Sequence, residues 1–165
     1  MNKLILTAVF YISIVLESTL FAFLPIFGLV PNTTMILIIC YALYYEEKNG
    51  AIIGFTAGLI KDMIVGSVMG ISALTFMIIG YFVGYYNRKV FAENPTTPFV
   101  LAIISTIFHE SLYFLVVFLM GYPIHFGMAV SKIYVYQTIY NALLAIPLYF
   151  IFNRVIQSKF LRKIY

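Results

Sequence analysis

The stretch from Phe99 to Met120 reads FVLAIISTIFHESLYFLVVFLM and decides the fold class. A helix needs about 20 apolar residues to cross a bilayer core of about 30 Å, and this stretch supplies them. The whole chain has the same character, because 63% of its 165 residues are hydrophobic and only 10% are charged. A soluble domain of this size has roughly a quarter of its residues charged. The sequence therefore predicts an all-α membrane protein without a soluble domain.

Further apolar runs on both sides of this stretch predict a six-transmembrane helix bundle that forms one domain over residues 1–165. The predicted spans are 4–24, 31–45, 50–65, 71–86, 99–120 and 132–152, with a basic cytoplasmic tail at 153–165. The first run resembles a signal peptide in position, but its length, Glu17 and the lack of a small-x-small cleavage site predict a retained helix. The second and third spans are short, so a tilted or partly re-entrant hairpin is an alternative for them. The single cysteine, Cys40, excludes a disulfide within the chain.

The placement of lysine and arginine predicts the orientation of the bundle. With six spans, eight cations fall on one side: Lys3, Lys48, Arg88, Lys89, Arg154, Lys159, Arg162 and Lys163. The other side holds Lys61 and Lys132, both at helix edges. Cytoplasmic loops carry the excess of cations, so both termini are predicted to be cytoplasmic. The Tyr44–Tyr45 and Tyr85–Tyr86 pairs fall at the same predicted interface. The net charge of +4 is thus explained by cations that set the membrane topology, and it does not indicate a nucleic-acid-binding protein.

Glycines recur along one face of two neighbouring spans. Gly50, Gly54 and Gly58 repeat every four residues in the third span, and Gly80 and Gly84 do the same in the fourth. Helices in lipid associate through close backbone contact at small residues. We expect these glycines to pack the third span against the fourth, with docking of a partner protein as the less favoured alternative.

Polar and charged side chains inside the apolar runs are the second informative feature, because each is costly in a membrane unless it is paired or hydrated. These residues are Glu17, Asp62, His109, Glu110, Lys132, Gln137 and Asn141. We expect their helices to converge on a polar cluster in the outer half of the bundle. A structural network is the favoured interpretation, ahead of a partner-docking or regulatory surface and a small-molecule or ion site.

Asp62 needs a specific partner, because the C-terminal end of its outward-running helix carries partial negative charge. Lys132, at the matching depth on the sixth span, is the first candidate. Lys61, the neighbour of Asp62 in sequence, is the second, although we expect its side chain to extend outward to the interface.

No residue pattern points to catalysis, a metal or a cofactor. The sequence has no Cys/His metal spacing and no phosphate-binding loop. His109 and Glu110 are adjacent, so on a helix their side chains point about 100° apart. The sequence therefore predicts a protein that is not an enzyme.

Several motifs resemble the MreD family of rod shape-determining membrane proteins. They are Pro31 at the start of a short span, GFTAGLIKD from Gly54 to Asp62, MGISAL from Met69 to Leu74, and GYFVG from Gly80 to Gly84. The specific part covers residues 31–84, and the second half of the chain agrees in hydropathy. The resemblance implies a multi-pass protein of the bacterial cytoplasmic membrane that scaffolds or regulates side-wall peptidoglycan synthesis. It also implies the partners MreC, MreB filaments, RodA and a class B penicillin-binding protein.

A protein of another class has a similar size and span count. The substrate-binding S components of energy-coupling-factor vitamin transporters have a fold that this bundle is expected to resemble. Those proteins carry an Ala-x-x-x-Ala face on the first helix, whereas residues 7–16 read TAVFYISIVL and contain no such pair. A scaffold is therefore favoured over a solute binder.

Overall fold

The computed structural model describes residues 3–19, 29–65, 68–87, 96–121 and 133–157. Over these residues the regular elements are six α-helices and one π-helical turn. They are α1 (Lys3–Ser18), α3 (Thr33–Ala42), α4 (Glu47–Ile64), α5 (Ile71–Asn87), α6 (Thr96–Leu119), η1 (Ile133–Gln137) and α8 (Thr138–Gln157). The prediction of an all-α protein is confirmed for this part of the chain.

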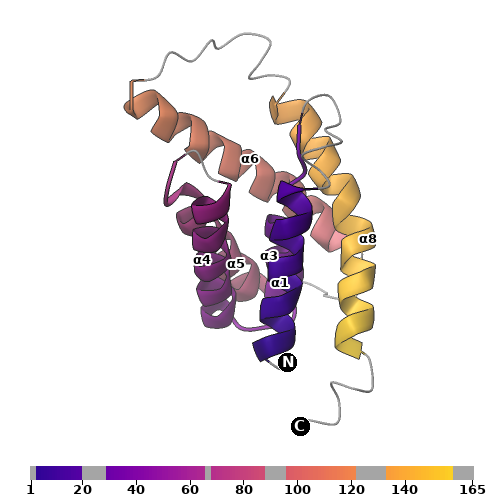
Figure 1. Ribbon diagram of the computed structural model, residues 1–165. Coiled ribbons are helices and arrows are strands. Elements are labelled where there is room, and N and C mark those ends of the chain that lie inside the picture. The colour runs from indigo at the N-terminus through magenta and orange to yellow at the C-terminus, as the bar shows by residue number, and fades with distance from the viewer. Residues whose placement is uncertain (1–2, 20–28, 66–67, 88–95, 122–132, 158–165) are drawn as a thin grey trace.

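The short helix α3 lies at the centre of the bundle (Figure 1). All its residues from Thr33 to Ala42 are buried, and α1, α4, α5, α6 and α8 all contact it. A helix that is apolar all round is expected to be buried on all sides. With ten residues, α3 is about 15 Å long, half the thickness of a bilayer core. Its polar N-terminal end is therefore enclosed by the other helices.

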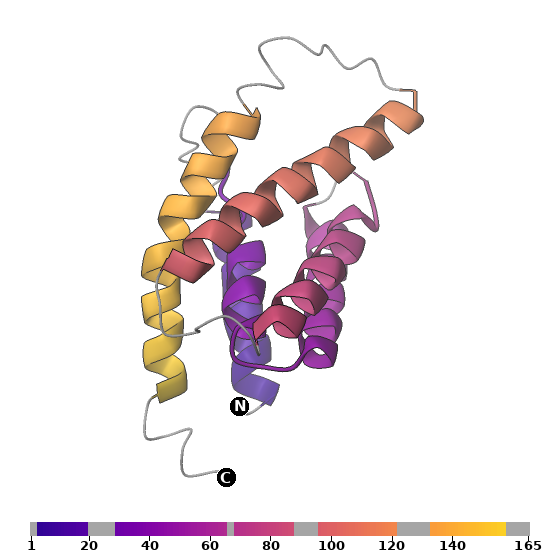
Figure 2. The same ribbon diagram turned by 180° about the vertical axis from the view of Figure 1, so that it is seen from behind.

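The helices α4 and α5 form a closely packed antiparallel hairpin, and α6 runs obliquely across α5 (Figure 2). α8 packs along α6 and α3 on the other side of the bundle. The start of α1, the start of α4 and the end of α8 lie at the same end of the molecule (Figure 1).

Several helices differ at their ends from the predicted spans. α4 begins at Glu47, three residues before the predicted start, because an acidic residue suits the positive N-terminal end of a helix. α6 also begins earlier, at Thr96, with Pro98 in its first turn. The sequence places Pro31 at the start of a span, whereas in the structure it precedes the N-cap residue Asn32 and lies outside α3. α8 continues to Gln157, into the predicted tail. The remainder of the first predicted span, beyond Thr19, lies outside the described residues.

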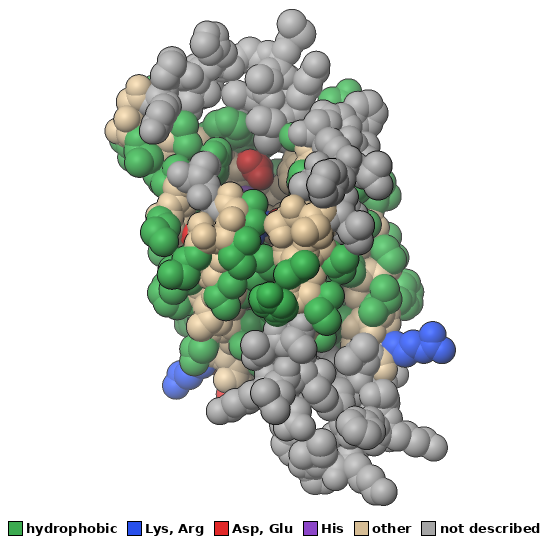
Figure 3. Space-filling view, in the orientation of Figure 1, with side chains coloured by type: hydrophobic (Ala, Val, Ile, Leu, Met, Phe, Trp, Pro, Cys, Tyr) green, Lys and Arg blue, Asp and Glu red, His purple; other side chains and the backbone are tan. Residues whose placement is uncertain are grey.

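Among the described residues, two helices are long and apolar enough to cross a membrane: Thr96–Leu119 and Tyr134–Arg154. Shorter apolar helices cover Val9–Ser18, Thr33–Ala42 and Ile71–Tyr86. Large hydrophobic side chains cover the middle of the outer surface, and exposed Lys and Arg side chains lie at the lower end (Figure 3). A soluble monomer rarely exposes such an extensive apolar surface.

Candidate functional site: a buried polar network

The N-terminal end of α3 is held by a carboxylate from another helix. Glu17 of α1 accepts hydrogen bonds from the backbone N–H of Thr34 at 3.2 Å and from its hydroxyl at 2.9 Å. The hydroxyl of Thr33 donates to the same oxygen at 3.2 Å. The first N–H groups of a helix have no partner within the helix and carry partial positive charge. Glu17, which is 6% exposed, supplies both a hydrogen-bond acceptor and a negative charge at this position.

Lys61 of α4 neutralises Glu17. Its ammonium group pairs with the second oxygen of that carboxylate and donates to Oδ1 of Asn32 at 2.8 Å. The same ammonium lies 5.4 Å from the centre of the Phe76 ring. The expectation that Lys61 extends outward is therefore wrong. A buried carboxylate without a counter-charge is strongly destabilising, and pairing with Glu17 draws this lysine inward.

Asn32 and Asn141 connect α3 to α6 and α8. Asn32 caps α3 by accepting from the N–H of Met35 at 3.1 Å, while its own N–H donates to Oδ1 of Asn141 at 2.8 Å. The amide nitrogen of Asn141 donates to the Thr106 hydroxyl at 3.1 Å. One turn before Asn141, Gln137 donates to the carbonyl of Val30 at 2.7 Å. Both amide side chains of the last predicted span thus bind the segment that leads into α3.

His109 and Glu110 have different surroundings, as expected for neighbours on a helix. His109 is buried, and its Nδ1 lies 2.9 Å from the hydroxyl of Thr75 on α5. Its ring also packs against Phe76 at 5.4 Å between centres. Glu110 is half-buried, and it has no hydrogen bond with the part of the chain that the structure describes. It is therefore not hydrogen-bonded to the network around Glu17.

Asp62 holds the start of α5. Its carboxylate accepts from the backbone N–H groups of Gly70 at 2.9 Å, Ser72 at 3.3 Å and Ala73 at 3.1 Å. Asp62 is 3% exposed. The positive end of α5 thus compensates for the unfavourable end of α4. Of the two predicted partners, Lys61 instead binds Glu17, and Lys132 lies outside the described residues.

The glycine face of α4 is filled by the backbone of α5. Gly50 and Gly80 face each other, so a Cβ atom on either would overlap the carbonyl group of the other. A Cβ on Gly54 would lie 2.6 Å from the carbonyl carbon of Phe76, and one on Gly58 would lie 2.7 Å from Cα of Ala73. At the other end of the hairpin, a Cβ on Gly84 would lie 2.7 Å from Cα of Glu47. This geometry supports internal packing, because α5 already occupies the face.

The network joins helices and offers no open coordination site in the described residues. Glu17 and Asp62 each use both carboxylate oxygens, and no three potential metal ligands of the His, Cys, Asp and Glu types gather there.

Sequence reasoning missed Asn32, Thr33, Thr34, Thr75 and Thr106. Asn32 carried a usable signal, since an Asn just before an apolar run is a typical helix N-cap. The four threonines carried no such signal, because threonine is common in apolar helices.

Residues 1–160 match the protein-family model described as rod shape-determining protein MreD. The chain belongs to the MreD family. It is accordingly a membrane protein of a family that determines rod shape and that is not known as an enzyme family. Searches of curated proteins and of solved structures gave no match.

Proposed function

We propose that this MreD-family chain is a non-enzymatic scaffold or regulator of the machinery that elongates bacterial cells. In this role it binds MreC in the cytoplasmic membrane and supports side-wall peptidoglycan synthesis and rod shape. The family match over residues 1–160 carries the proposal. MreB filaments, RodA and a class B penicillin-binding protein are the proposed partners at the level of the whole complex.

The arrangement of polar groups supports a scaffold. The carboxylates of Glu17 and Asp62 are saturated by donors from neighbouring helices, so their charge is used to hold helices together. In contrast, large apolar side chains on α4, α5 and α6 are exposed, including Met63, Phe82 and Phe118. A rigid bundle with an apolar exterior suits binding of other membrane helices by surface packing.

The proposed topology has six spans with both termini in the cytoplasm. It is supported by the cation bias of the sequence and by the common position of the start of α1, the start of α4 and the end of α8 (Figure 1). The exposed cations Lys48 and Arg154 belong to two of these ends. The solute-binding alternative is not favoured by the family match.

Co-purification tests the proposal. The chain is expressed with affinity-tagged MreC from the same bacterium, membranes are solubilised in mild detergent, and the eluate is analysed by size exclusion. A tagged bitopic membrane protein from outside the elongation machinery serves as the control. We expect a complex with MreC and none with the control. Absence of the MreC complex, combined with saturable binding of a vitamin to the purified chain, would favour the solute binder.

A further inference from the structure

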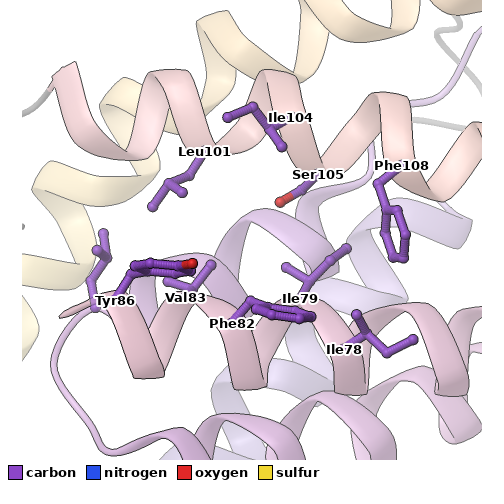
Figure 4. A pocket seen from close by; sticks show the side chains of 10 residues that line it. Ile78, Ile79, Phe82, Val83, Tyr86, Leu101, Ile104, Ser105 and Phe108 are labelled. Atoms are coloured by element: carbon purple, nitrogen blue, oxygen red, sulfur yellow. The ribbon is translucent and has the colours of Figure 1, made fainter.

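An apolar groove of about 460 Å³ lies between α5 and α6, where the oblique course of α6 separates the two helices (Figures 2 and 4). One wall is formed by Ile78, Phe82 and Tyr86 of α5, and the other by Leu101, Ile104 and Phe108 of α6. Ser105 contributes the only hydroxyl besides that of Tyr86 among the lining residues. Ile104 is 58% exposed and Phe82 is 53% exposed, so the groove opens sideways to the surroundings of the bundle.

The dimensions of the groove suit a hydrocarbon chain better than a whole helix. From Ile78 to Tyr86 the wall extends about 12 Å along α5, at 1.5 Å per residue. A volume of about 460 Å³ over that length gives a mean cross-section of about 38 Å². An α-helix with its side chains is about 10–12 Å wide, which corresponds to a cross-section of roughly 80–110 Å². The groove is therefore wide enough for an extended hydrocarbon chain and too narrow to enclose a whole helix.

The position of the groove agrees with one leaflet of the membrane. Tyr86 lies one residue before the end of α5, and α5 is antiparallel to α4, so this end of the groove lies beside the start of α4. Glu46 and Lys48 at the start of α4 are both exposed there. A length of about 12 Å is close to half of a bilayer core of about 30 Å. Tyrosine, with an apolar ring and a polar hydroxyl, favours the boundary between the acyl chains and the headgroups.

We propose that this groove binds one acyl chain of a phospholipid from the leaflet at the Lys48 end of the bundle. The methylene chain lies against Phe82, Ile104 and Phe108, and the headgroup lies near Tyr86, at the boundary that tyrosine favours. The open side of the groove is continuous with the acyl chains of the surrounding membrane. This lipid site depends on the membrane location of the chain and goes beyond the proposed scaffold role.

The chain contains no tryptophan, so a single introduced tryptophan is the only indole reporter. Phe108→Trp places it in the groove, at the end away from Tyr86 (Figure 4). Leu115→Trp places it on the same helix, on an exposed position that does not line the groove. Each purified variant is titrated in detergent with phosphatidylglycerol that carries bromine atoms at the middle of its acyl chains, which quench indole fluorescence on contact.

We expect quenching of the Phe108→Trp reporter to saturate near one lipid per protein, at about tenfold less lipid than the Leu115→Trp reporter requires. Quenching of the Leu115→Trp reporter should follow the lipid content of the micelle without saturating. Adding Ser105→Phe, which fills the groove, should make the Phe108→Trp curve resemble that of the control. Ile78→Phe fills the groove from the other wall and replaces Ser105→Phe if that variant is not monodisperse.

Three results would overturn the inference. The first is a Phe108→Trp titration that is as linear as the control. The second is a saturable titration that neither groove-filling variant changes. The third is loss of quenching when tagged MreC is bound, which would assign the groove to side chains of a partner helix. MreC co-purification of the Ser105→Phe variant is measured in parallel, so that failure of the lipid site and failure of the scaffold role are distinguished.

Discussion

At the scale of single residues, Glu17 and Asp62 have the same function in different parts of the bundle. Each is a buried carboxylate that accepts N–H groups from the first turn of another helix: Glu17 at α3 and Asp62 at α5. Inside a membrane such N–H groups have no water to bind, and each unsatisfied group costs several kcal/mol. The carboxylates are therefore stabilised by the same helix ends that they satisfy.

The contacts of Asp62 predict the order of its variants. Asp62→Asn keeps an oxygen acceptor but loses the charge, and hydrogen bonds to a charged group contribute about 1.5–3 kcal/mol. Asp62→Leu leaves three N–H groups without an acceptor, that of Gly70 and those of Ser72 and Ala73 in α5, and each costs about 1–3 kcal/mol. We expect a modest loss of protein level for Asp62→Asn and a sharp loss for Asp62→Leu, measured by immunoblot and by cell shape in a strain that depends on this gene. Normal level and normal rods with Asp62→Leu would contradict the capping role.

The Glu17–Lys61 pair predicts a coupling between two substitutions. Lys61→Met leaves the Glu17 carboxylate buried without its cation, which is expected to cost about 3–5 kcal/mol. Glu17→Gln removes the charge and retains an acceptor for Thr34, so the double variant should recover most of that loss. Melting temperatures in detergent measure the four states of the cycle. Lys48→Met, at an exposed lysine of the same helix, is the control and should leave the melting temperature unchanged. Strict additivity would show that the two residues do not pair.

At the scale of elements, the α4–α5 hairpin depends on backbone contact at glycine. Gly54→Leu introduces bulk where α4 touches the carbonyl group of Phe76, and no flexible side chain is available there to move aside. We expect a loss of several kcal/mol, at the upper end of the overpacking range of about 1–3 kcal/mol or beyond it. Thermal unfolding in detergent checks this, with Thr56→Leu on the exposed side of the same helix as control. An unchanged melting temperature combined with lost MreC binding would instead identify the glycine face as a docking surface.

The sequence predicts contact faces of helices well, because their signal is a short repeat along one segment of the chain. Gly50, Gly54 and Gly58 indicate a contact face because four residues make about one helical turn. The pairing of the polar residues was not predictable in the same way. Asn141 binds a backbone group 109 positions away, and Lys61 binds Glu17 44 positions away. Such pairs depend on the final packing of the helices. The role of Asp62 was obscured for another reason, because the charge of its own helix end is visible in the sequence and the opposing end of α5 is not.

At the scale of the whole molecule, the cation bias predicts the sidedness of the loops. Reporter fusions at Lys48, at Asn87 and after the C-terminal Tyr165 should report the cytoplasm, because cation-rich loops are retained on that side. A fusion near His125, which lies between the fifth and sixth predicted spans and outside the described residues, should report the opposite side. Paired reporters that are active on only one side of the membrane provide internal controls. A C-terminal fusion on the outer side would contradict the six-span topology.

The sequence separation of the two carboxylates from their partners has a consequence for biogenesis. The donors that satisfy Asp62 follow it by 8 to 11 residues, so α4 and α5 can enter the membrane as a hairpin with this acid already satisfied. Glu17 is made first, and its counter-ion Lys61 is synthesised 44 residues later. In the proposed six-span topology, α1 enters the membrane before the counter-ion of Glu17 has been synthesised. We expect insertion of the first helix to be the step that depends most on the insertion machinery. The chain should also be most exposed to membrane proteases at this step.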